Sequence, residues 1–340
     1  MKALRQVGVL LIIGALFIGA IAFAQEADVR FFSVVLGCGG GPREDNVSGY
    51  MLWPAGSTEE AVFLDAGTLT VGIRKAEELG NLWDFVVPSD SNLTREGWVL
   101  QNAKAYLISH AHLDHILALV INSPVDSKKD IMGIDSTIDH LANHVFNWEI
   151  WPNFGDEGPG FPLGVYHYVR LVPDEEVPIS GTSMTVEPFV LSHSEPYQST
   201  AFLIRDDGYY VLYFGDTGPD KVEGTDNLKT VWERIAPLVS EGKLLGMFLE
   251  VSYVDATPDK SLFGHLTPSW MMNELHVLAE LVDPDSPDTA LEGFKVVINH
   301  IKPVFKVGPT PASVIAEELA QLNDLGVEFI IPYQGMRLGF

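Results

Sequence analysis

The sequence predicts an α/β protein built from β-sheets covered by helices. Short runs of β-branched and aromatic residues end at polar or glycine-rich turns, as strands buried on both faces do. Several of these turns lead into stretches that read as helices. No repeat, low-complexity tract or long linker divides residues 25–340. We therefore expect one layered domain with insertions.

The predicted strands are continuous apolar runs, and each stops at a turn rich in glycine or in polar side chains. They cover residues 29–36, 61–64, 105–108, 185–191, 210–214, 245–249 and 294–298. The predicted helices cover residues 71–79, 114–120, 228–236, 268–281 and 311–325. The helix start at Pro268 is well marked, because Thr267 can cap the helix and proline suits its first turn.

Residues 123–169 do not follow this alternation of strands and helices. The run HVFNWEIWPNFGDEGPGFPLGVYHYV within this region is dense in aromatic residues, proline and glycine. We expect an insertion here that forms a cap or rim over the functional site. Its aromatic side chains would either stack on a planar ligand or pack the insertion against the domain.

The chain is strongly acidic, with 46 Asp and Glu residues against 21 Lys and Arg and a formal net charge of −25. This charge repels anionic membranes and argues against RNA or DNA as a substrate. A small anionic substrate would need a concentrated positive charge in its pocket, which bound metal ions supply. The single cysteine, Cys38, excludes an intramolecular disulfide. A small residue in a tight turn is its favoured role, ahead of thiol nucleophile or metal ligand.

The N-terminus resembles a secretory signal. A basic start precedes an uncharged apolar run over residues 7–23, and an Ala-Phe-Ala cleavage site ends at Ala24. We expect residues 1–24 to be a signal peptide and the mature protein to be periplasmic or secreted, without stable membrane insertion. The alternative is an uncleaved membrane anchor, because the run is nearly long enough to span a bilayer.

One hexamer carries the strongest chemical signal. His110-Ala111-His112-Leu113-Asp114-His115 follows a predicted strand and opens a predicted helix. An H-x-H-x-D-H pattern arises by chance on the order of once in thousands of such chains. His110 and His112 point the same way from an extended turn, whereas Asp114 and His115 begin the helix and can reach a second ion. Imidazole and carboxylate ligands without cysteine suit Zn²⁺, with Mn²⁺ or Fe²⁺ as alternatives.

Four residues cannot fill the coordination shells of two ions, so further ligands are expected. His193, Asp216 and His300 each stand where a predicted strand gives way to a turn. Three such strand ends on one rim of a sheet are hard to explain by packing alone. Asp216 suits a shared position, because its carboxylate has two oxygens. The sequence thus predicts two divalent metal ions, which lower the pKa of bound water and make it nucleophilic at neutral pH.

With the later SHS, GDTG and INH segments, the hexamer resembles the metallo-β-lactamase superfamily in its dinuclear phosphodiesterase branch. More narrowly, the chain resembles the class II cyclic-nucleotide phosphodiesterases. The segments behind this narrower resemblance are LGCGGGPREDNVSGY (36–50), SHAHLDH (109–115), IWPNF (150–154), FGHLTP (263–268) and INHIKP (298–303). They span nearly all of residues 25–340. The hexamer alone indicates the superfamily, and the other segments together favour the subfamily.

The resemblance implies an αββα sandwich with the metal ions at one edge. It implies that His110, His112 and His193 bind one ion, that Asp114, His115 and His300 bind the other, and that Asp216 is shared. One departure from the family pattern is Ala118, where we would expect glycine. Alanine is also small, so this departure leaves the fold assignment intact.

The resemblance also implies catalytic and substrate-binding residues. His265, in a turn before the helix at 268, would protonate the leaving oxygen while Glu250 orients it. The alternative for His265 is a histidine that bonds only the backbone of its turn. Asp114 counts among the catalytic residues as well as the ligands. Asn46 and Ser48 would contact phosphate or ribose, or else cap a turn.

The expected function is metal-dependent hydrolysis of a small 3′,5′-cyclic nucleotide, cyclic AMP or cyclic GMP, to the 5′-monophosphate. One alternative is another hydrolase of the superfamily, such as a lactamase or a different phosphodiesterase. The other is an exported metal-binding or solute-binding protein without turnover. A monomer and a homodimer both fit the sequence.

Overall fold

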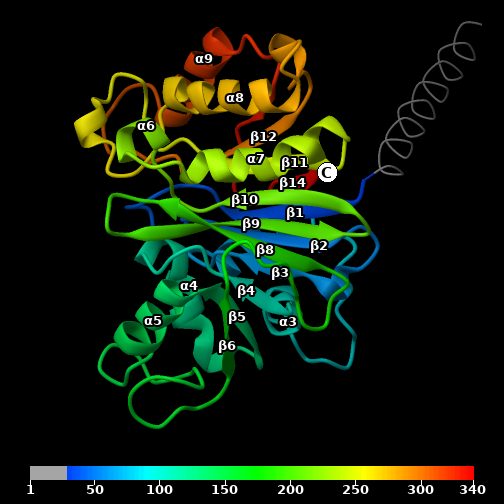
Figure 1. Cartoon of the computed structure of the whole chain (residues 1–340). Coiled ribbons are helices and arrows are strands. Elements are labelled where there is room, and N and C mark those ends of the chain that lie inside the picture. Colours follow the sequence, from blue (N-terminus) through cyan, green and yellow to red (C-terminus); the bar gives the residue numbers. More distant parts are fainter. Residues whose placement is uncertain (1–28) are drawn as a thin grey trace, which may run out of the picture.

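The computed structural model describes residues 29–340, which form two seven-stranded sheets packed face to face with helices on both outer surfaces (Figure 1). The first sheet has the strand order β14-β1-β2-β3-β4-β5-β6, and the second has the order β13-β12-β11-β10-β9-β8-β7. This is the αββα arrangement that the family resemblance implied.

The bounds of the elements are as follows. The first sheet contains β1 (Phe31–Gly37), β2 (Gly49–Pro54), β3 (Val62–Leu64), β4 (Ala105–Leu107), β5 (Lys129–Ile134), β6 (Tyr166–Leu171) and β14 (Arg337–Gly339). The second contains β7 (Val177–Pro178), β8 (Thr185–Ser192), β9 (Gln198–Asp206), β10 (Tyr209–Phe214), β11 (Leu244–Glu250), β12 (Lys295–Asn299) and β13 (Glu328–Ile330). The α-helices are α2 (Thr70–Glu78), α3 (Arg95–Asn102), α4 (Leu113–Asn122), α5 (Asp135–His140), α6 (Asp220–Glu223), α7 (Asn227–Ser240), α8 (Pro268–Val282) and α9 (Pro311–Leu322).

Three buried apolar layers hold the sandwich together. Helices α2 to α5 cover the outer face of the first sheet, and α7 to α9 cover that of the second. A third layer lies between the sheets. Alternate residues of one strand enter different layers: Met247 and Leu249 of β11 face the helices, whereas Phe248 faces the other sheet. Strands buried on both faces therefore appear as continuous apolar runs in the sequence.

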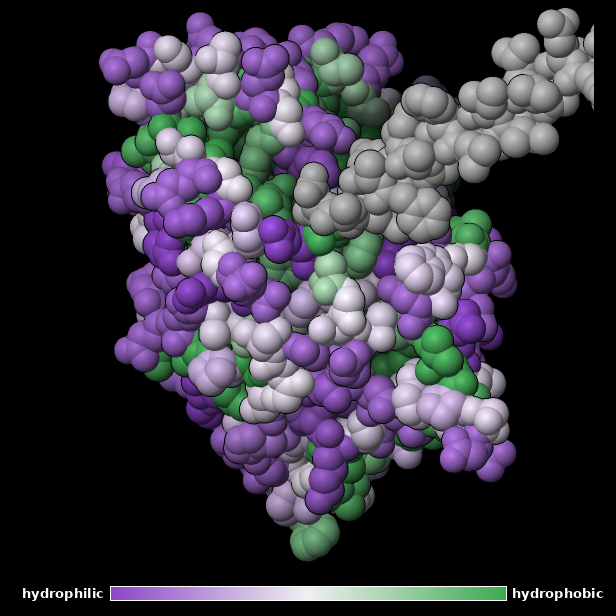
Figure 2. Space-filling model, turned by 90° about the vertical axis from the view of Figure 1, so that its right-hand side faces the viewer, coloured by the Kyte–Doolittle hydropathy of each residue, from purple (hydrophilic) through white to green (hydrophobic). Residues whose placement is uncertain are grey.

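The direction of the parallel strands determines which edge of the two sheets carries the strand-end residues predicted as ligands. Strands β3 to β6 run parallel to one another, and so do β10 to β13, so their C-terminal ends meet at one edge of each sheet. The C-terminus lies at the opposite edge, where the Arg30 amide donates to the Phe340 carbonyl at 2.6 Å. Figure 2 views the molecule from this opposite side, whose surface is largely hydrophilic with scattered apolar residues.

Every predicted strand and helix occurs, with ends within four residues of the prediction. Residues 123–169 differ from the expected insertion, because they contain β5 and most of β6, which are parallel neighbours in the first sheet. Only about residues 141–165 stand outside the sheet and its helices. The dense aromatic, proline and glycine run between these strands obscured them in the sequence.

The predicted signal peptide lies outside the described residues. Over residues 29–340, none of the helices combines the length and the apolar character needed to cross a bilayer.

Candidate metal centre

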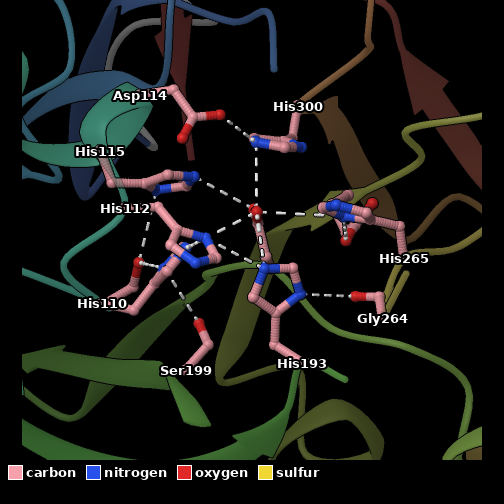
Figure 3. Close-up of polar contacts among 12 residues, drawn as sticks. His110, His112, Asp114, His115, His193, Ser199, Gly264, His265 and His300 are labelled. Atoms are coloured by element: carbon pink, nitrogen blue, oxygen red, sulfur yellow. Dashed lines mark hydrogen bonds and ion pairs between the residues drawn. The ribbon is translucent and has the colours of Figure 1, made fainter. Parts of the chain in front are cut away.

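The seven predicted metal ligands meet at the edge where β4, β8, β10 and β12 end (Figure 3). They are His110 and His112 after β4, Asp114 and His115 in the first turn of α4, His193 after β8, Asp216 after β10 and His300 after β12. Three ligands therefore follow strands of the second sheet, and they face the four ligands that lie between β4 of the first sheet and the first turn of α4.

One group consists of three histidines and one carboxylate. His112 Nδ1 lies 3.0 Å from His110 Nε2 and 3.2 Å from His193 Nε2. Asp216 Oδ2 lies 3.7 Å from both His110 Nε2 and His193 Nε2. These four atoms fall within 4.8 Å of one another, a spacing that allows all of them to bind a single ion.

A second group lies on the other side of Asp216. Its members Asp114, His115 and His300 also offer ligand atoms within 4.8 Å of one another. His300 Nε2 is 3.2 Å from Asp114 Oδ2 and 3.2 Å from Asp216 Oδ2. His115 Nε2 is 3.2 Å from Asp216 Oδ1. The Asp216 carboxylate therefore contacts members of both groups.

Burial keeps four of the imidazoles neutral. Desolvation, with the neighbouring His115, holds the pKa of His110 well below its usual range. Desolvation, with His193, lowers the pKa of His112 to about 4. Burial also lowers the pKa values of His193 and His300. A neutral imidazole has a free lone pair, which is the form that binds a metal ion.

The carboxylates at this centre are ionised, and they hold one charged histidine. Burial alone would raise the pKa of Asp216, but His300 and His115 hold it well below its usual range. Burial would lower the pKa of His115, but Asp216 and Asp65 raise it well above its usual value. Both shifts express the same attraction between a cation and the surrounding carboxylates, which a bound metal ion would also experience.

Two buried atoms at this centre point to a cation as their partner. His115 Nε2 and Asp216 Oδ1 are both buried and lie 3.2 Å from each other, and neither has another polar partner within residues 29–340. A buried polar atom without a partner is costly in free energy. Because the surrounding donors are imidazole nitrogens and carboxylate oxygens, a divalent ion such as zinc fits this site.

Asp65 supports the centre, and sequence reasoning missed this role. Its carboxylate is fully buried and accepts hydrogen bonds at 2.7 Å from His115 Nδ1, the Tyr213 hydroxyl, and both the amide and the hydroxyl of Ser109. The bond to Nδ1 turns His115 Nε2 toward Asp216. The available signal was that Asp65, like the ligands, directly follows a predicted strand.

Other contacts orient the first group. His193 Nδ1 is 2.9 Å from the Gly264 carbonyl, which directs Nε2 inward. The Tyr197 ring stacks on His112 with centroids 4.4 Å apart and an interplanar angle of 13°, and it also stacks with the His140 ring at 5.4 Å and 3°. No sequence pattern indicated Tyr197, because it lies 85 positions from His112 and contacts it only in the folded chain.

His265 and Glu250 form a buried pair beside Asp216. His265 Nδ1 is 2.7 Å from Glu250 Oε1, and the Ser252 hydroxyl donates to Glu250 Oε2 at 2.7 Å. Burial opposes the charge on Glu250, but His265 lowers the pKa of that carboxyl. With Nδ1 held by Glu250, the Nε2 atom of His265 is the one left for other partners. His265 Nδ1 is also 3.9 Å from Asp216 Oδ2, so the pair adjoins the ligands.

Glycine is required where the N-terminal loop meets the centre. A Cβ atom at Gly40 would lie 2.4 Å from the His300 ring, closer than real contacts allow. The next amide, of Gly41, donates to Asp114 Oδ2 at 2.8 Å. The glycine-rich segment thus lets the backbone approach two predicted ligands directly.

The side chains of the remaining predicted site residues, Asn46 and Ser48, make no hydrogen bond to the seven ligands within residues 29–340. Asn46 Oδ1 accepts from the Cys38 amide at 3.3 Å, and Ser48 is buried with its hydroxyl unbonded. Burial raises the pKa of the Cys38 thiol to about 11, so it carries little thiolate at neutral pH.

This layered fold is similar to the metallo-β-lactamase fold. A metallo-β-lactamase fold protein from Bacillus subtilis superposes with a TM-score of 0.57 at 17% identity, covering 91% of this chain and 99% of that one. Within that fold, the chain belongs to the class-II cAMP phosphodiesterase family, whose model matches residues 79–335.

Individual relatives agree with this assignment. The chain is 44% identical over 312 residues to a 3′,5′-cyclic-nucleotide phosphodiesterase of Aliivibrio fischeri, covering 91% of this chain and 93% of the relative. The crystal structure of unliganded yeast PDE1 superposes with a TM-score of 0.79 at 25% identity, covering 92% of this chain and all of that one. The predicted family and fold are confirmed.

Proposed function

We propose that this protein hydrolyses 3′,5′-cyclic nucleotides, cyclic AMP and also cyclic GMP, to 5′-monophosphates with two divalent metal ions. The observation that carries the proposal is the pair of ligand groups that meet at Asp216, with His265 adjoining them. Membership of the class-II cAMP phosphodiesterase family supports the substrate class.

One ion would be held by His110, His112 and His193, the other by Asp114, His115 and His300, and both by Asp216. Zinc suits these neutral imidazoles and carboxylates best, with manganese or iron as alternatives. When bound, the two ions supply Lewis acidity for the phosphate and lower the pKa of water. They also provide positive charge for an anionic substrate in a chain whose net charge is −25.

The chain's own residues would then handle the proton of the leaving group. As a water oxygen bonds to phosphorus and the P–O3′ bond breaks, the ribose oxygen needs a proton. His265 would donate this proton from Nε2, because Glu250 holds Nδ1 at 2.7 Å and fixes the ring orientation. Asp114 would act by binding metal, oriented by the Gly41 amide.

The test is an assay of metal-loaded protein, residues 25–340, against cyclic AMP, cyclic GMP and a β-lactam. We expect turnover of the cyclic nucleotides only, together with about two equivalents of metal by elemental analysis. Turnover of the β-lactam instead would favour the lactamase alternative. Tight retention of cyclic AMP without product would favour a binding protein. Less than one equivalent of metal, with no gain of activity on adding zinc or manganese, would contradict the dinuclear site.

Export is a separate part of the proposal. The signal-like sequence of residues 1–24 supports cleavage after Ala24 and a periplasmic or secreted protein. Mass spectrometry of the protein from each cell fraction should find a chain that begins at Gln25 outside the cytoplasm. A full-length chain in the membrane fraction would instead indicate an anchor. Light scattering of the mature protein decides between monomer and homodimer.

A further inference from the structure

A groove adjoins the candidate metal centre on the side of His265. It lies between residues 252–257, which follow β11, and residues 302–309, which follow β12, and Pro311 and Val314 of α9 also line it. Its volume is about 280 Å³. Small-molecule pockets typically measure roughly 300–1,000 Å³, so this groove suits part of a small ligand and not a polymer.

The groove is in contact with the candidate general acid. The Tyr253 ring, which lines the groove, lies 5.7 Å from the His265 ring at an interplanar angle of 74°. Ser252, another lining residue, has its hydroxyl 3.1 Å from His265 Nδ1. The oxygen that His265 would protonate from Nε2 belongs to the ribose, so the ribose would lie beside the His265 ring, which the Tyr253 ring borders.

Lys302 provides a cation between the groove and the metal ligands. Its amide donates to the Ser252 carbonyl at 3.2 Å, and its ammonium lies 3.7 Å from where a Cβ of Gly41 would be. The Gly41 amide in turn contacts Asp114. Within residues 29–340 the Lys302 ammonium makes no hydrogen bond or ion pair, which suits it to an anionic ligand in a strongly acidic chain.

A larger cavity of about 510 Å³ lies on the other side of residues 302–309 and is lined by Asn46 and Tyr333 among others. The glycine-rich segment separates it from the centre. A Cβ at Gly40 would point into the His300 ring, whereas one at the neighbouring Gly39 would point toward Asn46. Successive residues of an extended segment face opposite ways, so this cavity is turned away from the metal ligands.

We propose that the groove between residues 252–257 and 302–309 holds the nucleoside of the substrate, with the base against the Tyr253 ring and the phosphate beside the Lys302 ammonium. This inference rests on the proposed hydrolysis of cyclic nucleotides and names the subsite of that same centre. An aromatic ring accepts any base by stacking, so Tyr253 would serve adenine and guanine alike.

Binding of the product to the metal-loaded protein tests this subsite without requiring turnover. Calorimetry compares 5′-AMP, which has a nucleoside, with inorganic phosphate, which has none. Tyr253→Ala should weaken binding of 5′-AMP by roughly 5- to 150-fold, the loss expected when a base loses an aromatic stacking partner. Phosphate binding should change less than twofold, and Tyr253→Phe should bind 5′-AMP like the parent protein.

Two matched control variants, Tyr333→Ala and Lys306→Gln, change residues that line the larger cavity instead of the groove. Tyr333→Ala removes an aromatic ring from the larger cavity and should leave 5′-AMP binding unchanged. Lys302→Gln should weaken 5′-AMP and phosphate together, by roughly tenfold, because the ammonium contacts only the phosphate. Lys306→Gln makes the same change in charge further along the segment and should weaken neither.

The outcomes separate this inference from the proposed function. If Tyr253→Ala fails to fold, Thr257→Glu places a charge in the same groove and should weaken 5′-AMP far more than phosphate. Unchanged 5′-AMP affinity in either folded variant overturns the subsite, as does a loss confined to Tyr333→Ala. A parent protein that binds 5′-AMP but does not hydrolyse cyclic AMP would overturn the function and leave the subsite standing.

Discussion

At the edge of the first sheet where β5 begins, Asp126 and Lys129 form a buried ion pair with N–O distance 2.7 Å. The second carboxylate oxygen of Asp126 accepts hydrogen bonds from the hydroxyls of Tyr106 and Tyr166 at 2.7 and 2.9 Å. Lys129 also donates to the Leu100 carbonyl. Every polar side-chain atom of this cluster has a partner within the chain.

At the opposite edge, Asp216 is as deeply buried among histidines, but the pairing is incomplete. Its Oδ1 atom and His115 Nε2 lie 3.2 Å apart, and within residues 29–340 neither atom has any further polar partner. A polar cluster closed within the chain contributes to stability and specificity of folding, whereas one with unpaired atoms is built for a ligand. Replacing residues at the two edges should therefore affect different measurements.

The largest expected effect is that of Asp216→Asn on turnover. Asparagine keeps the shape but loses the charge that attracts both ions, so kcat/KM for cyclic AMP should fall by more than the roughly 10–100-fold typical of outer partners of a metal site. The metal-free protein should stay folded by circular dichroism, because asparagine fills the same space beside His115 and His300. Near-normal activity would remove Asp216 from the centre.

His265→Ala tests whether His265 acts as a general acid or as a further metal ligand. The variant should keep both metal ions, and its rate on cyclic AMP should fall by roughly 10²–10⁴, the range for losing a positioned acid. A diester with a nitrophenolate leaving group should lose much less, because that oxygen departs without a proton. Equal losses on the two substrates would assign His265 a ligand or structural role, and no loss on either would restrict it to its turn.

Lys129→Met tests the closed cluster. It leaves the Asp126 charge buried without its ion partner, which should lower the free energy of unfolding by about 3–5 kcal/mol in urea titrations. Activity per folded molecule should not change. Removing the exposed Lys75 of the Lys75–Glu78 pair is the matched control and should cost under about 1 kcal/mol.

The double variant Asp126→Asn/Lys129→Met gives a sharper result. Burial lowers the pKa of Lys129 even though Asp126 opposes this shift, so the desolvation of the ammonium exceeds its attraction to the carboxylate. Removing both charges should therefore recover much of the stability that the single replacement loses. Equal losses in the single and double variants would show that the ion pair itself stabilises the fold.

The sequence predicted the metal ligands at one edge but not the Asp126–Lys129 ion pair at the other. The ligands were predictable because the hexamer is local and because His193, Asp216 and His300 each end an apolar run, which parallel strands bring to one edge. Asp126 and Lys129 gave no such signal. Asp126 precedes β5 and Lys129 is its first residue, in a polar stretch of a strand hidden by the aromatic run that follows it. Their tyrosine partners come from other strands.

Long-range contacts account for the other omissions. Strands β2 and β9 were missed, although both are central in their sheets, since the predicted strands were those that end at marked polar turns. Tyr197 and Tyr253 have no periodic signature, and only folding brings them against His112 and His265. Local pattern thus predicted the ligands, whereas the residues that surround them depended on the packing of the two sheets.

Asp65→Asn should change both the free energy of unfolding and the affinity for zinc, each by a modest amount. Both measurements are needed, because Asp65 resembles Asp126 in its hydrogen bonds and yet contacts a metal ligand. Its carboxylate is fully bonded within the chain, as Asp126 is, yet one of those bonds holds His115. An asparagine amide would face a donor in either orientation: the Ser109 amide at one oxygen position, or His115 Nδ1–H at the other. The mismatch should cost about 1–3 kcal/mol of unfolding free energy in the metal-free protein.

The same change should weaken metal binding. With His115 less firmly oriented, competition with a chelator should show a roughly 10–100-fold loss of affinity for one of two zinc equivalents. Ser199→Ala, which removes only a 3.4 Å contact to His110 Nδ1, serves as the control and should change both measurements little. Loss of stability with unchanged zinc affinity would place Asp65 with the closed cluster alone. Weaker zinc binding at full stability would show that its hydrogen bonds serve the metal centre and contribute nothing to the fold.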